Sequence, residues 1–70
     1  MTYELWDLTS RNMIDWFASP VDALEAVQAY LDAGEADLVA LFVRDTNGDI
    51  TMSPTGPALT EWATRLSAAS

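Results

Sequence analysis

The acidic side chains are the residues of this chain that could do chemistry, and one acidic segment resembles a metal loop. Asp45-Thr46-Asn47-Gly48-Asp49 places oxygen ligands at alternate positions, as the start of a calcium loop does. A full loop needs a bidentate Glu at its twelfth position, and that position is Gly56. Asn, Gly and Asp also form turns. The segment therefore indicates a turn, and we predict no metal site and no cofactor.

Carboxylates near strand ends could act as acid and base. Asp7 and Asp15 fall near the ends of predicted strands, with Glu4 close by, and such a pair works when its surroundings separate the two pKa values. The alternative is a solvated rim. Ser10 and Ser53 have no His or Lys in the chain to activate them. We predict no catalytic residues and no enzyme activity, and a small enzyme that uses carboxylates is the remote alternative.

A second acidic group surrounds Gly34. Asp32, Glu35 and Asp37 could form a docking point for an Arg-rich partner, and the alternative is a solvated helix end. Acid at a helix C-terminus is unfavourable by some tenths of a kcal/mol, which favours the docking interpretation slightly.

The composition excludes several classes of function. The 70 residues carry a net charge of -8, with 11 acids, three arginines and no Lys, His or Cys. Disulfides and Cys/His zinc sites are therefore excluded. Three scattered arginines cannot form the basic patch that nucleic acid needs. The negative charge has two interpretations. It keeps a small domain in solution, or the protein is an acidic inhibitor or DNA mimic that binds a basic partner.

The chain shows no signal for export or for a membrane. Its first residues lack the basic stretch and the apolar run of a signal peptide. No apolar run approaches the roughly 20 residues of a membrane span. We expect a cytoplasmic protein with no membrane partner.

Hydrophobic spacing predicts one domain, residues 1–70, made of two ββα units at 3–34 and 38–68. In the first unit, residues 3–8 and 13–17 are typical of strands. Ser19 and Pro20 begin a helix that ends at Gly34.

The second unit repeats this order. Residues 38–44 give the strongest strand signal, and Asn47-Gly48 predicts a hairpin with a type I′ turn to a strand over 49–52. Pro57 begins an amphipathic helix that includes Trp62.

These elements predict an α+β fold, a four-stranded antiparallel sheet of order 2-1-3-4 with two helices on one face. Because side chains alternate along a strand, each residue can be given a face. The predicted core face carries these residues: Tyr3, Leu5, Ile14, Trp16, Val39, Leu41, Val43, Ile50 and Met52. A bulge of one residue would change the facing in the first hairpin.

The other face has nothing in the chain to cover it. Trp6, Met13, Phe17 and Phe42 are predicted to lie there. An open apolar face of this kind marks an interaction site. We therefore expect a non-catalytic protein-interaction module that forms a homodimer through this face or binds an unidentified protein.

Part of the chain resembles known bacterial proteins. Tyr3-Glu4-Leu5-Trp6-Asp7, then Asn12, Ile14 and Phe17, then Asp22-Ala23-Leu24 resemble small uncharacterised bacterial ββα-type proteins with a YELWD…N-I…F…EAL pattern. This resemblance covers about the first half of the chain and implies the fold without assigning functional residues. A weaker resemblance is to HicB-like antitoxins, which also place a helix after antiparallel strands. Their Pro- and Gly-rich segment before the helix is missing here.

Overall fold

A computed structural model describes residues 1–69 of the chain and contains the predicted ββαββα order. Its elements are β1 (Thr2–Asp7), β2 (Asn12–Phe17), α1 (Pro20–Asp32), the short 3-10 helix η1 (Ala36–Leu38), β3 (Val39–Arg44), β4 (Ile50–Met52) and α2 (Pro57–Ala69). The predicted strands and helices are thus present, and η1 is an addition. Leu38, which was predicted to begin the third strand, lies in η1.

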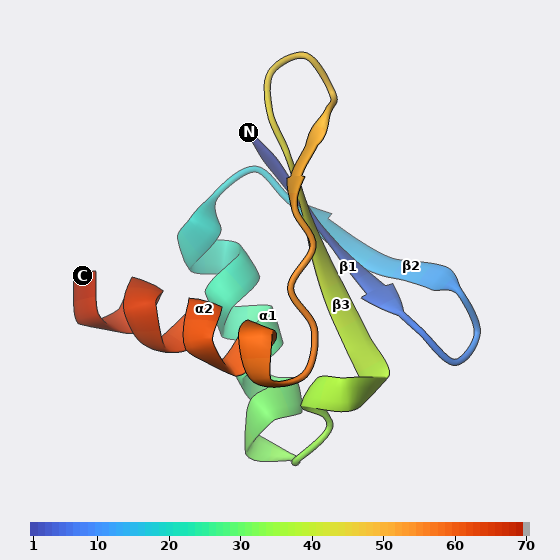
Figure 1. The fold of residues 1–70 in the computed structure, drawn as a ribbon, viewed down its shortest axis with the longest axis vertical. Coiled ribbons are helices and arrows are strands. Elements are labelled where there is room, and N and C mark those ends of the chain that lie inside the picture. The colour runs from blue at the N-terminus through green and yellow to red at the C-terminus, as the bar shows by residue number, and fades with distance from the viewer. Residues whose placement is uncertain (70) are drawn as a thin grey trace.

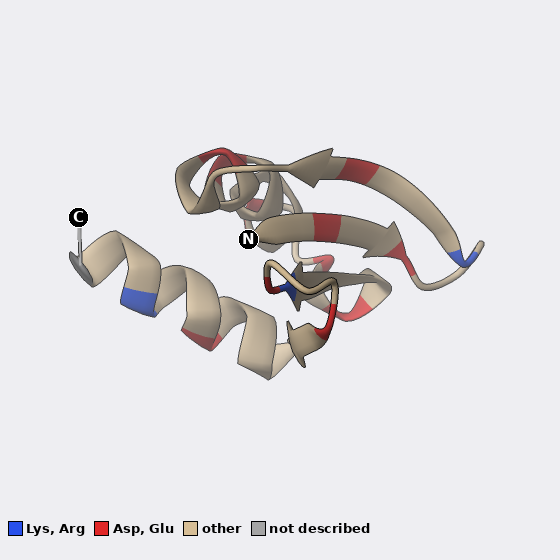
Figure 2. Ribbon diagram, turned by 90° about the horizontal axis from the view of Figure 1, so that it is seen from above, with Lys and Arg blue, Asp and Glu red and all other residues tan. Residues whose placement is uncertain are grey.

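The four strands form one antiparallel sheet of order β2-β1-β3-β4, as predicted. Both helices lie on the same side of this sheet (Figures 1 and 2). The fold class, α+β, is therefore confirmed. Within residues 1–69, neither helix combines the length and the apolar content that a bilayer span requires.

Local signals set both ends of α1. The Ser19 hydroxyl accepts a hydrogen bond from the Val21 backbone N–H at 3.2 Å, and Pro20 takes the first helical position. At the other end, Gly34 has a φ of 73°. The N–H groups of Gly34 and Glu35 donate to the carbonyls of Leu31 and Tyr30. This is a Schellman motif, and it explains why the helix ends here.

The hydrophobic core lies between the helices and one face of the sheet. It consists of Tyr3, Leu5, Ala23, Val27, Val39, Leu41, Val43, Leu59 and Ala63. The rings of Tyr3 and Trp62 lie 6.5 Å apart, so Trp62 packs against this core as predicted. The two helices therefore cover the face of the sheet that carries Tyr3 and Leu5.

The prediction for the second strand was wrong, because a β-bulge interrupts its pairing with β1. Tyr3 pairs with Phe17 and Glu4 with Trp16, and the register shifts between Leu5 and Trp6. Phe17 therefore shares the face of Tyr3 and packs against the core. Trp16, which was predicted to be in the core, shares the face of Glu4 and is 56% exposed. Two aromatic residues have exchanged faces.

Asp15 changes sides with them. It pairs with Leu5 and so lies on the helix side of the edge strand, whereas strict alternation with Trp16 in the core would have placed it on the open face.

The prediction for the second hairpin was also partly wrong. Val43 pairs with Met52 as predicted, but Ile50 pairs with Arg44 and lies away from the core. The reason is the turn. Gly48 has a φ of 85°, whereas Asn47 has no positive φ, so the turn is not type I′. The Gly48 N–H donates to the Asp45 carbonyl and the Asp45 N–H to the Asp49 carbonyl. This is a three-residue loop with Gly at its last position, which shifts the register by one residue.

Candidate functional site: the outer face of the sheet

The face of the sheet opposite the helices is the candidate site, and we call it the outer face. Its side chains are Glu4, Trp6, Met13, Trp16, Ala40, Phe42, Arg44 and Ile50. The structure thus brings together three of the four predicted interaction residues, Trp6, Met13 and Phe42. Phe17 is the exception. Trp16 and Ile50 belong to this face and were missed, because the bulge in the first hairpin and the three-residue loop of the second place them there.

An aromatic pair forms the centre of the outer face. The rings of Trp6 and Phe42 meet edge to face, with centroids 6.0 Å apart and an interplanar angle of 73°, which is a favourable geometry for two aromatic rings. Both residues are half-buried, and Ala40, which pairs with Trp6, is only 3% exposed. The centre of the face is therefore ordered by its own side chains.

More exposed apolar residues surround this centre. Trp16 is 56% exposed, Ile50 49% and Met13 46%. Met13 and Trp16 lie on β2 and Ile50 on β4, the two edge strands, and Trp6 on β1 and Phe42 on β3 lie between them. The outer face is thus apolar from one edge of the sheet to the other.

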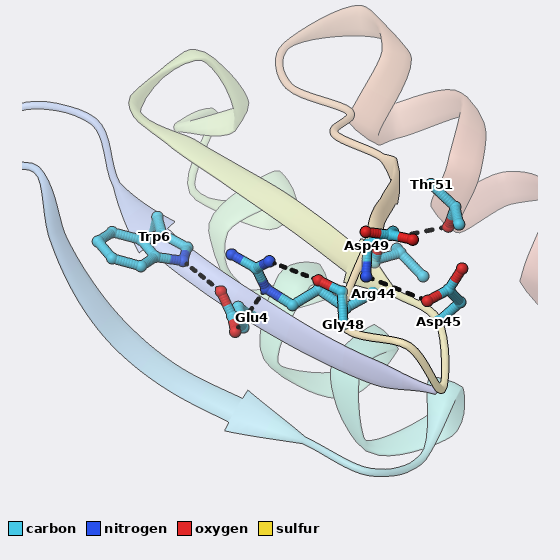
Figure 3. A network of polar contacts seen from close by, with 8 residues as sticks. Glu4, Trp6, Arg44, Asp45, Gly48, Asp49 and Thr51 are labelled. Carbon is cyan, nitrogen blue, oxygen red and sulfur yellow. Dashed lines mark hydrogen bonds and ion pairs between the residues drawn. The ribbon is translucent and has the colours of Figure 1, made fainter.

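One ion pair crosses the outer face and is satisfied within the chain (Figure 3). The Glu4 carboxylate accepts a hydrogen bond from the Trp6 indole at 3.1 Å and from Arg44 Nε at 3.0 Å. The Arg44 guanidinium also donates to the Gly48 carbonyl at 2.9 Å. A partner that covers this face therefore meets a neutralised pair and no bare carboxylate.

An open hollow of about 610 Å³ lies on the same face. Its lining residues are Trp6, Asp7, Leu8, Arg11, Phe42, Arg44 and Ile50. Arg11 lies in the turn between β1 and β2 and has a φ of 61°, a conformation that is uncommon for a residue other than Gly. Two of the chain's three cations line this hollow.

Asp7 is the last residue of β1, and its carboxylate stabilises the turn that follows, although it also lies beside this hollow. Its carboxylate accepts a hydrogen bond from the Thr9 backbone N–H at 2.9 Å. This bond, followed by one from the Ser10 side chain, lowers the pKa of Asp7 below the ordinary value of an aspartate. The pKa of a general acid at neutral pH moves in the opposite direction. Asp15 caps the backbone N–H of Trp16 at 2.8 Å and lies on the helix side of β2.

The predicted acidic docking residues are exposed, and two of them have contacts within the chain. The Gln28 amide donates to the Asp32 carboxylate at 3.0 Å. Asp37, in η1, lies against Gly56, directly before α2. Acid beside a helix N-terminus is favourable, so Asp37 has a structural reason to be there.

The Asp45–Asp49 segment forms a turn, as predicted, but the turn is not type I′. One oxygen of the Asp45 carboxylate accepts hydrogen bonds from the backbone N–H groups of Asn47, at 2.9 Å, and Asp49, at 3.1 Å. These bonds explain the spacing of polar residues that resembles a calcium loop. Residues 1–69 contain no group of three acidic side chains placed to hold a metal ion.

The chain was compared with models of protein families, with curated proteins and with solved structures, and none of the three comparisons returned a match.

Proposed function

We propose that this chain is a non-catalytic protein-interaction module that forms a homodimer through the outer face. One observation carries the proposal. Trp16, Met13 and Ile50 are each close to half exposed on a face that neither helix covers. A cytoplasmic location and the absence of a membrane partner are part of the proposal.

The size of the face supports an interaction of this kind. Strands lie about 4.8 Å apart and rise about 3.3 Å per residue. Three of the four strands have six residues, so the sheet measures roughly 20 Å in each direction. Exposed apolar patches of several hundred Å² are often functional. A standard interface buries about 800 Å² per partner, close to a fifth of this chain's accessible surface of 4371 Å².

The charge distribution supports a second copy as the partner. Two chains of net charge -8 repel each other. On the outer face this repulsion is reduced, because Arg44 neutralises Glu4 and Arg11 lies at the rim. The acidic residues are otherwise spread over strands, helices and loops (Figure 2). The outer face therefore presents little net negative charge to a second copy of the chain.

Sedimentation equilibrium of the wild type and of Trp16→Glu tests the proposal. Trp16 is exposed, so the variant should fold, and we expect a dimer for the wild type and a monomer for the variant. Val21→Glu is the matched control. Val21 is 59% exposed, but it lies on α1, on the opposite side of the sheet, so this variant should remain dimeric. A wild type that is monomeric at roughly 100 µM would contradict the homodimer.

Salt separates this proposal from the acidic inhibitor or DNA mimic, the alternative function. Added NaCl screens the repulsion between two acidic chains and should strengthen the dimer. The same salt would weaken the binding of a basic protein to an acidic surface. Changing Asp32, Glu35 and Asp37 to Asn, Gln and Asn should leave dimerisation intact. If these changes abolish binding to a basic protein captured from the host, mimicry is the better description.

A further inference from the structure

The hollow on the outer face combines an apolar floor with cationic groups that have free donors. Trp6, Leu8, Phe42 and Ile50 supply the floor. Its volume, about 610 Å³, falls within the range of about 300–1,000 Å³ for small-molecule sites. Such sites are mostly apolar, with a few convergent polar groups that orient the ligand.

Both arginines have donors to offer. The guanidinium of Arg11 forms no hydrogen bond or ion pair with residues 1–69. A guanidinium has five N–H donors, and Arg44 uses one on Glu4 and one on the Gly48 carbonyl. Arg11 also occupies a turn position with positive φ, which Gly or Asn adopts more readily. An Arg side chain is thus held at the hollow in a backbone conformation that favours other residues.

The acids beside the hollow do not compete for these donors. Glu4 already accepts from Trp6 and Arg44. The Asp7 carboxylate accepts from Thr9 in its own turn. An incoming anion therefore has a free cation, Arg11, and the remaining N–H groups of Arg44 beside an apolar floor.

We propose that this hollow is a binding site for a molecule with an apolar body and one carboxylate. The apolar body would cover Trp6 and Phe42, and the carboxylate would accept hydrogen bonds from Arg11 and Arg44, as guanidinium groups bind carboxylates in a planar, bidentate way. A single charge suits the site better than two, because the whole chain is acidic. This inference does not depend on the homodimer, although both use the outer face.

NMR titration with 4-phenylbutyrate tests the site. The chain has three Trp and three Arg residues, so its indole and guanidinium Nε–H signals are few enough to assign. We expect saturable shifts of the Trp6 indole and the Arg11 Nε–H, with the Trp62 indole unchanged. The neutral analogue 4-phenylbutanamide should bind at least about fivefold more weakly, as expected for the loss of an exposed charge pair. Phenyl phosphate, which carries more charge, should also bind more weakly.

Two arginine variants form a matched pair. Arg11→Gln should weaken binding of 4-phenylbutyrate by roughly fivefold. Arg65→Gln should not change it, because Arg65 lies on α2 and pairs with Glu61. Equal effects of the two variants would overturn the assignment, as would equal binding of the amide or tighter binding of phenyl phosphate.

The titration is repeated in Trp16→Glu, because Trp16 lies on the outer face but does not line the hollow. This variant leaves the hollow open even if the wild type is a dimer. Absence of a saturable shift in folded Trp16→Glu refutes the carboxylate site and leaves the homodimer standing. Binding by a wild type that sediments as a monomer refutes the homodimer and supports the site.

Discussion

Gly56→Ala should destabilise the fold more than Gly48→Ala, although both glycines have positive φ, 56° and 85°. A Cβ added at Gly48 would meet nothing within 4 Å, whereas one added at Gly56 would lie 2.6 Å from Asp37 Oδ1. The change at Gly48 therefore measures backbone strain alone. The change at Gly56 adds the displacement of the Asp37 carboxylate, which lies next to the start of α2.

The expected difference follows from these contacts. An L-residue in the left-handed region costs about 1–2 kcal/mol, and this term is common to both variants. Asp37 is exposed, so its carboxylate can move. An off-rotamer side chain costs about 0.5–1.5 kcal/mol. Gly56→Ala should therefore cost about 1 kcal/mol more than Gly48→Ala, which corresponds to about 4–8 °C in melting temperature for a domain of this size.

Urea denaturation of four chains measures this coupling: the wild type, Gly56→Ala, Asp37→Ala and the double variant. The cost of Gly56→Ala should fall by about 1 kcal/mol when Asp37 is already Ala, since the clash is then absent. The same cost in both backgrounds would refute the reasoning. It would also remove the structural explanation for Asp37 and strengthen its assignment to the acidic docking group.

Four further predictions concern the turns and the charge. Gly48→Val should lower the free energy of unfolding by about 1–3 kcal/mol. Asn47→Ala should cost little, because only Gly48 of the pair has positive φ. Equal losses of stability in thermal melts would indicate positive φ at both positions, as in a type I′ turn. Folding lowers the pKa of Asp7. The ionised Asp7 carboxylate therefore stabilises the fold above about pH 3.9, and this stabilisation is lost as the pH falls through the pKa of Asp7 in the folded state. Asp7→Asn should therefore destabilise the chain at pH 7, and this effect should shrink as the pH falls below about 3.9; urea midpoints measured across that range check this. Calcium should leave the melting temperature unchanged, and a saturable shift at micromolar calcium would contradict the turn interpretation of Asp45–Asp49. Duplex DNA should not bind at physiological salt, and a gel shift with micromolar affinity would refute this.

Local signals in the sequence were sufficient for the elements and their order. The two ends of α1 are set by hydrogen bonds and φ values that depend on the residue types of Ser19, Pro20 and Gly34. Alternation along β3 was equally clear, and its core face is as predicted. Because right-handed crossovers are strongly preferred, the strand order could also be predicted from the order of elements.

The facing of β2 and β4 depends on the tertiary structure. In β2, Ile14 and Trp16 alternate with Met13 and Phe17, so either register presents an apolar set to the core, and hydrophobicity does not distinguish them. Phe17 takes the inner position by packing against the core, and a bulge absorbs the extra residue.

The three-residue loop after Asp45 shifts the register of β4 by one residue, so Ile50 pairs with Arg44 and lies on the outer face. Composition and alternation were therefore enough to predict that an apolar outer face exists and that Trp6 and Phe42 belong to it. Only the packing of the whole chain decided that Trp16 and Ile50 complete this face and that Arg11 and Arg44 meet beside a hollow, because these are contacts between strands whose registers no local signal specifies.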